Sequence, residues 1–175
     1  MSLRFPIIRT YKLLLREIIA TDLENVYKGL SDPRVIQHYG VSYDSLKATK
    51  AQMDWFAEEK QLWWAICSPD NKEFYGAGGL NDIDHSAKRA EIGLWLLPQH
   101  WGKGIMKEAL PLIANFGLNQ LKLNRIEGFV DTDNTNCKRA MAKLDFTLEK
   151  TIPNFEEKDG KPVSVDVYIK TLEIR

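Results

Sequence analysis

The chain has 175 residues, of which 44% are hydrophobic and 27% are charged, a composition typical of a soluble globular protein and not of a disordered chain. Its 24 basic residues balance its 24 acidic ones, which argues against a protein that binds nucleic acid or an anionic membrane by neutralising many phosphates. The length suits a single domain over residues 1–175, and with no bilayer-spanning apolar run and no secretory leader we expect a cytoplasmic protein.

The first half of the chain predicts two helices and then a run of strands. An opening strand is expected over residues 11–19, and Thr21-Asp22-Leu23-Glu24 has the spacing of a capping box for a helix that ends near Leu30. After a short turn or helix at Ser31-Asp32-Pro33, apolar residues at helical spacing predict a second helix over residues 44–60. Turn residues then separate three strands, at 62–68, 74–83 and 89–97, which indicates an antiparallel meander.

In the second half, helices and strands alternate. A long helix is expected over residues 103–118, and Pro111 inside it predicts a kink because proline lacks an N–H group and its ring clashes with the preceding turn. A strand (125–130), a helix (134–144) and two strands joined around Asp159-Gly160 (146–151 and 163–171) complete the chain. Because the strands on either side of the long helix can pair in parallel through its crossover, this order predicts an α/β fold with a mixed sheet.

The junction between residues 94–97 and the long helix is the most informative stretch. Pro98 ends the strand, two glycines follow in Gly102-Lys103-Gly104, and the helix begins at once. A helix N-terminus offers unpaired amides and a positive dipole end, and glycine lets a phosphate approach closely, so the junction suggests a pyrophosphate site. The alternative is a plain strand-to-helix turn. The spacing fits neither a Rossmann fingerprint nor a P-loop.

A longer comparison of motifs favours the pyrophosphate site. Gln99-x-x-Gly102-x-Gly104 after a strand is similar to the (Q/R)xxGx(G/A) motif of the GNAT acetyltransferases. Further segments resemble, in order and spacing, the RimJ/RimL branch that acetylates ribosomal-protein N-termini: Ala90-Glu91-Ile92-Gly93-Leu94-Trp95-Leu96, Glu108-Ala109, Leu123-Asn124-Arg125-Ile126-Glu127, Asp133-Asn134-Thr135-Asn136-Cys137 and Lys143-Leu144-Asp145-Phe146. The resemblance implies a GNAT fold, α/β (α+β), with a mixed, mostly antiparallel sheet of about seven strands and about four helices.

The resemblance also implies acetyl-CoA as co-substrate and assigns residues to it. The pantetheine arm would lie along the strand edge at Leu94, Trp95 and Leu96, and Asn134 would contact it while capping the next helix. The diphosphate would be held mainly by backbone amides from Gln99 through Ile105. The cofactor-binding residues expected in this loop are Gln99, Trp101, Gly102, Lys103, Gly104, Ile105 and Met106. Lys103 is either a phosphate partner or a solvated lysine of the first helical turn.

Acetylation needs a neutral amine, and two glutamates are candidates for the base that accepts its proton. Glu91, on the strand before the expected pyrophosphate site, matches a glutamate that many GNAT enzymes use as the base. Alternatively, its carboxylate only pairs with backbone groups or with an arginine. Glu156 matches the position thought to serve in the ribosomal-protein branch, and its alternative is a solvated hairpin charge. The amide of Leu94 or Trp95 would stabilise the developing oxyanion.

The leaving thiolate of coenzyme A also benefits from a proton donor. Cys137 stands where the branch has serine in its Asn-x-x-Ser motif, so it is either that donor or a small buried cysteine. No metal site is expected, because the two cysteines and three histidines lack zinc spacing. The expected partner is an amine acceptor, a protein N-terminal Ser or Ala by resemblance, or alternatively a polyamine or amino sugar. A non-catalytic acyl-CoA-binding domain is the alternative hypothesis. The expected oligomeric state is a monomer or a homodimer.

Overall fold

A computed structural model describes residues 4–172, in which one eight-stranded sheet forms the centre of the fold. The strands lie in the order β1-β2-β3-β4-β5-β6-β8-β7, and only β5 and β6 pair in parallel. Their bounds are β1 (Ile8–Arg9), β2 (Leu14–Glu17), β3 (Leu62–Cys67), β4 (Phe74–Asp84), β5 (Arg89–Leu96), β6 (Arg125–Asp131), β7 (Thr147–Lys158) and β8 (Lys161–Thr171). The α/β fold with a mixed, mostly antiparallel sheet is therefore confirmed.

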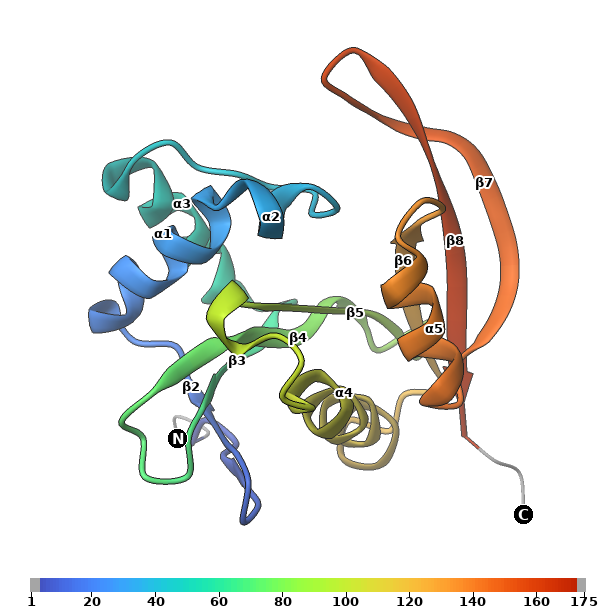
Figure 1. Ribbon diagram of the computed structural model, residues 1–175. Coiled ribbons are helices and arrows are strands. Elements are labelled where there is room, and N and C mark those ends of the chain that lie inside the picture. Colours follow the sequence, from blue (N-terminus) through green and yellow to red (C-terminus); the bar gives the residue numbers. More distant parts are fainter. Residues whose placement is uncertain (1–3, 173–175) are drawn as a thin grey trace.

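The helices form two layers, one on each face of the sheet (Figure 1). One layer contains α1 (Leu23–Ser31), α2 (Pro33–Ile36) and α3 (Leu46–Phe56), and the other contains α4 (Ile105–Asn115) and α5 (Thr135–Lys143). Shorter turns are η1 (Ala20–Asp22), η2 (Pro98–His100) and the π-helical turn η3 (Phe116–Gln120). Within residues 4–172, no helix combines the length and the apolar composition needed to cross a membrane.

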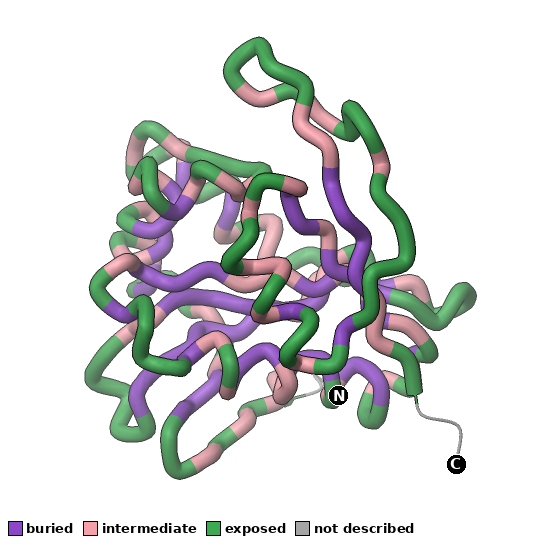
Figure 2. The backbone as a smooth tube through the Cα atoms, turned by 45° about the vertical axis from the view of Figure 1, so that its right-hand side comes forward, coloured by how far each residue is buried: buried purple, intermediate pink, exposed green. Residues whose placement is uncertain are grey.

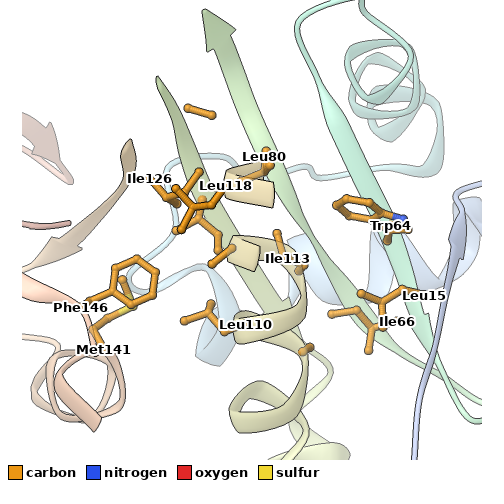
Figure 3. Close-up of a cluster of buried hydrophobic side chains, with 14 of the residues drawn as sticks. Leu15, Trp64, Ile66, Leu80, Leu110, Ile113, Leu118, Ile126, Met141 and Phe146 are labelled. Carbon is orange, nitrogen blue, oxygen red and sulfur yellow. The ribbon is translucent and has the colours of Figure 1, made fainter. Parts of the chain in front are cut away.

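The larger hydrophobic core lies between the sheet and α4. Ile113 of α4 is fully buried in a cluster of side chains that extends from Leu15 on β2 to Ile126 on β6 (Figure 3). Each large aliphatic side chain removed from water contributes roughly 1.5–3 kcal/mol, so this core anchors α4 firmly against β5. The glycine-containing loop at the N-terminus of α4 is thereby held at the end of β5.

The chain begins differently from the prediction. A short β1 precedes the opening strand, which shortens to β2, and the sheet has eight strands instead of about seven. The predicted capping box at Thr21 and Glu24 is wrong. Asp22 is buried and its carboxylate accepts from the Arg16 guanidinium at 2.8 and 2.9 Å and from the Ile19 amide at 2.8 Å, so the carboxylate caps η1 and α1 starts one residue later.

Other element bounds also differ from the prediction. The second helix predicted, over 44–60, is the shorter α3: it begins at Leu46, because Ser45 caps it by accepting from the Ala48 amide, and it ends at Phe56. The long helix continues through Pro111 to Asn115 before η3. The last hairpin is longer than expected, since β7 runs to Lys158 and β8 begins at Lys161. In Figure 2 its tip extends beyond the rest of the chain and is mostly exposed.

Candidate active site

Strands β5 and β6 part soon after they meet. Their parallel register covers three rungs, Arg89 with Arg125, Ala90 with Ile126 and Glu91 with Glu127, after which β6 pairs only with β8. A strand that loses its neighbour leaves amides and carbonyls without ladder partners. The C-terminal half of β5 therefore has a free edge toward β6.

The alternation of hydrogen bonds identifies which residues of β5 face that edge. The Leu97 amide donates to the carbonyl oxygen of Tyr75 on β4 at 2.8 Å. Every second residue of an antiparallel strand faces the same neighbour, so the backbone groups of Trp95 also point toward β4. Leu94 and Ile92 then direct theirs toward β6, and the Leu96 carbonyl on the same edge accepts the Trp101 indole N–H at 2.9 Å. The edge offers Ile92 and Leu94 to a ligand, whereas the ring of Trp95 is buried under α1.

The loop after β5 forms an open anion cradle. Gly102 and Gly104 have φ values of +75° and +78°, and a Cβ atom added to either would have no heavy atom within 4 Å. This backbone conformation favours glycine, and the open space leaves room for a ligand. Glu108 N–H bonds to Gly104 O at 3.2 Å as the first bond of α4, so the amides of the preceding helical residues are free to bind an anion.

Not all amides of the predicted loop are available. Those of His100 and Trp101 donate to Leu97 O and Pro98 O and close η2. The free donors are therefore concentrated from Gly102 onward, and the side chains of Gln99 and Trp101 are exposed beside them. A pocket of about 480 Å³ adjoins one side of this loop. Its lining includes Lys103, Gly104, Ile105 and Lys107 together with Tyr11, Lys12, Leu13, Pro69, Glu73, Tyr75 and Glu108.

The N-terminus of α5 contains the predicted asparagine and cysteine. Asn134 caps the helix, with its Oδ1 accepting from the Cys137 amide at 3.2 Å, and this part of the prediction is confirmed. The amide nitrogen of the Asn134 side chain keeps its donor capacity. Cys137 is partly buried against the larger core, and burial raises the pKa of its thiol to about 11, so the thiol stays protonated.

Glu91 lies at the point where the two strands part. Its antiparallel neighbour on β4 is Asn81 and its parallel neighbour on β6 is Glu127. Burial raises the pKa of Glu91 to about 7, and the negative charges of Asp82 and Glu127 add to this effect. A carboxylate with a pKa near neutrality is suited to accept and release a proton at physiological pH.

A network of ion pairs surrounds Glu127. Arg125 Nε is 3.1 Å and Arg89 3.8 Å from its carboxylate. Arg125 also forms a two-pronged pair with Glu149 of β7, with its Nη2 atom 2.6 Å from Oε1. The arginines therefore satisfy Glu127 and leave Glu91 without a cation in this network.

Glu156 lies in a different environment. It is on β7, within an irregular part of the hairpin, and its ion-pair partner is Lys158 at 3.5 Å. The same Lys158 ammonium lies 3.0 Å from Asp131 at the end of β6, and His38 Nδ1 is 3.2 Å from that aspartate. The described contacts join Glu156 to this hairpin cluster and do not join it to Glu91.

The sequence analysis did not predict a polar and aromatic stripe on β6. Glu127, Phe129 and Asp131 alternate with residues that face the larger core, so the three share the face of Glu91. Phe129 stacks on Phe155 of β7 with ring centroids 5.6 Å apart. The period-two pattern in Arg125–Asp131 could have identified the stripe, although not the His38 contact, which joins residues 93 positions apart.

Comparisons with known proteins agree with this geometry. A family profile described as "Acetyltransferase (GNAT) domain" matches residues 12–147. The uncharacterized N-acetyltransferase YoaA of Bacillus subtilis is 31% identical over 169 residues, covering 94% of this chain and 96% of that protein. The uncharacterized N-acetyltransferase p20 of Bacillus licheniformis is 30% identical over 93% of both chains. The ribosomal-protein-serine acetyltransferase of Escherichia coli is 27% identical over 58% of this chain and 56% of its own.

Solved structures show the same fold at low identity. An acetyltransferase of the GNAT family from Bacillus anthracis superposes with a TM-score of 0.84 at 19% identity, covering 95% of this chain and 98% of that one. Spermidine N-acetyltransferase from Vibrio cholerae, in complex with CoA and spermine, has a TM-score of 0.85 at 16% identity, covering 93% and 96% of the two chains.

Proposed function

The chain belongs to the GNAT acetyltransferase family and is an acetyl-CoA-dependent N-acetyltransferase, and from this premise we propose that it acetylates the α-amine of a protein or peptide N-terminus. The transfer is direct, within a ternary complex, and Glu91 is the base. Similarity of motifs to the RimJ/RimL branch supports a Ser or Ala N-terminus. The central observation is the partly buried Glu91 carboxyl at the point where β5 and β6 part.

The residues around the parting strands fit acetyl-CoA. The free edge of β5 at Ile92 and Leu94 would bind the pantetheine arm, and the amides from Gly102 onward would bind the diphosphate. Leu96, Trp101 and the neighbouring loop and helix residues complete the proposed contacts. Acetyl-CoA supplies the acetyl group as an activated thioester. On this edge Leu94, rather than Trp95, has the amide that can donate to the carbonyl oxygen under attack.

The pKa of Glu91 favours an α-amine over an alkylamine. An α-ammonium group has a pKa of about 8, so transferring its proton to a carboxylate with a pKa of about 7 costs about 1.4 kcal/mol. An alkylammonium with a pKa of about 10.4 would cost about 4.6 kcal/mol. Glu91 is thus matched to the more acidic amine.

A polyamine is the second candidate acceptor. The carboxylates of Asp82 and Glu127 act electrostatically on Glu91, and such a cluster would also attract a second cationic nitrogen. The spermidine enzyme from Vibrio cholerae shares the fold. Glu127 is already paired with two arginines, however, which weakens this attraction.

An acceptor screen tests the proposal. Peptides with N-terminal Ser or Ala, spermidine and an amino sugar are each incubated with acetyl-CoA, and free coenzyme A is measured. The proposal expects the peptides to give the highest kcat/KM. Preference for spermidine would support the polyamine, and acetyl-CoA binding without coenzyme A release on any amine would support a non-catalytic acyl-CoA-binding domain.

A further inference from the structure

The segment that follows α2 contacts both parted strands. His38 reaches Asp131 at the end of β6, and the next residue, Tyr39, lies over Gly93 of β5. The Tyr39 amide also donates to Ile36 O at 3.1 Å, which fixes the start of the segment. Neighbouring residues thus anchor this segment to two strands that no longer pair with each other.

The Tyr39 hydroxyl lies next to the proposed base. It is 3.7 Å from the position that a Cβ atom would occupy on Gly93, two residues after Glu91 and on the same face of β5. The charge of Glu91 acts on the phenol, which agrees with this placement. The free backbone edge for the cofactor faces β6, whereas the hydroxyl lies on the face covered by the helices α1 to α3.

The Tyr39 hydroxyl is free to donate a hydrogen bond to a ligand. The hydroxyls of Tyr27 and Tyr43, in the same layer, donate to Asp44 O and Gln52 Oε1. The side-chain hydrogen bonds within residues 4–172 include none for Tyr39, and its oxygen is not among the buried polar atoms that lack a partner, so it is accessible to solvent. Burial raises the pKa of Tyr39 above its ordinary value, so the O–H group stays intact at working pH. A solvent-accessible donor beside an active site can exchange its water for a ligand oxygen.

The surroundings of Tyr39 strengthen such a contact. The indole of Trp63 extends across the sheet, and a Cβ atom on Gly93 would lie only 2.8 Å from its Cζ2 atom. Trp63 is 3% exposed and packs against Phe56 of α3 with centroids 5.5 Å apart. A hydrogen bond formed beside this apolar wall gains strength from the low local dielectric.

We propose that the Tyr39 hydroxyl selects the acceptor by donating a hydrogen bond to the carbonyl oxygen next to its α-amine. This inference rests on the proposed function and narrows it to α-amino carbonyl compounds, the chemistry of a peptide N-terminus. With the amine beside Glu91, the adjacent carbonyl is within a few bonds of the reacting nitrogen and can reach a donor on the same face. A polyamine has no carbonyl oxygen and would leave this donor unused.

Two small amines of similar basicity test the inference. Alaninamide has the α-carbonyl oxygen, and propargylamine lacks it. Tyr39→Phe removes only the hydroxyl, and we expect kcat/KM for alaninamide to fall about tenfold, mainly through KM, with less than about a twofold change for propargylamine. Tyr43→Phe, which removes a neighbouring hydroxyl bonded to Gln52, is the matched control and should leave the ratio of the two substrates unchanged.

The outcomes separate this inference from the proposed function. Equal losses with both amines would indicate a role in folding or in chemistry common to all acceptors and would overturn it. An unchanged kcat/KM for alaninamide in Tyr39→Phe would overturn it as well, while the α-amine function would stand. Wild-type protein that acetylates spermidine but no α-amine would overturn the proposed function itself.

Discussion

Glu91 and Glu127 are paired directly across β5 and β6, in the last parallel rung before the strands part. Two arginines neutralise Glu127, and the described contacts give Glu91 no such partner. Because only one of the two glutamates has cationic partners in these contacts, the two carboxylates differ in character. Glu127 belongs to an ion-pair network, and Glu91 has a pKa of about 7, which suits proton transfer.

Glu127→Gln tests the influence of the neighbouring charge. Removing a negative charge makes ionisation of Glu91 easier, so the pKa of Glu91 should fall and the acid limb of the kcat/KM profile should move to lower pH. Kinetics from pH 5 to pH 9 provide the measurement. Glu149→Gln, which removes the other carboxylate on Arg125, is the control and should shift the limb less. A shift to higher pH in Glu127→Gln contradicts the account.

The partial burial of Glu91 should also make stability depend on pH. Its pKa is raised from 4.5 to about 7, so the folded state binds the proton more tightly. The resulting stabilisation is complete below about pH 4.5 and is lost as pH rises through about 7. Relative to wild type, Glu91→Gln should therefore gain about 2–3 kcal/mol in the free energy of unfolding between pH 5 and pH 8. Urea unfolding at both pH values measures this, and an equal difference at both would refute the burial effect.

Acetyl-CoA binding should depend on the glycines of the cradle. Valine at Gly102 or Gly104 would strain a backbone with positive φ by roughly 1–2 kcal/mol and place methyl groups where a phosphate must approach. We expect calorimetry to show no acetyl-CoA binding by either variant, while circular dichroism remains native. Gly160→Val, at a φ of +74° in the β7–β8 turn, matches the strain and should keep full affinity. Wild-type affinity in Gly102→Val and Gly104→Val would rule out the cradle.

Cys137 is tested by comparing alanine with serine. If its protonated thiol donates to the leaving thiolate, Cys137→Ala should lower kcat severalfold and Cys137→Ser should largely restore it, because a hydroxyl can donate in the same place. Steady-state turnover at saturating substrates gives the answer. Equal rates in both variants and wild type would leave Cys137 a packing role only.

Sequence reasoning predicted the fold where periodicity and turn residues are local. The meander, the crossover helix and the Asn134 cap follow from such patterns. The capping box at Thr21 failed because Arg16, on a neighbouring strand, draws Asp22 into a buried ion pair that the local spacing does not reveal. The length of the last hairpin was underestimated because most residues of β7 are exposed and its apolar pattern is weak.

The candidate site was predictable only in its local parts. The two glycines and the position of Glu91 before them are recognisable in sequence. The pairing of Glu91 with Glu127 depends on the register of a parallel crossover, and the approach of Tyr39 to Gly93 joins segments more than fifty residues apart. Such contacts arise from tertiary packing, which one sequence does not specify.

The pH–rate profile of Glu91→Gln tests the central claim most directly. Glutamine keeps the shape of the side chain but cannot accept the ammonium proton, so kcat/KM with an alanyl peptide should fall about 10²–10⁴-fold at pH 7 while acetyl-CoA affinity stays nearly unchanged. The loss should shrink as pH rises toward the pKa of the acceptor, because solution then supplies the neutral amine. Glu156→Gln, whose carboxylate pairs with Lys158, should change the rate little. A loss of only a few fold in Glu91→Gln, or a larger pH-dependent loss in Glu156→Gln, would contradict the assignment of Glu91 as the base.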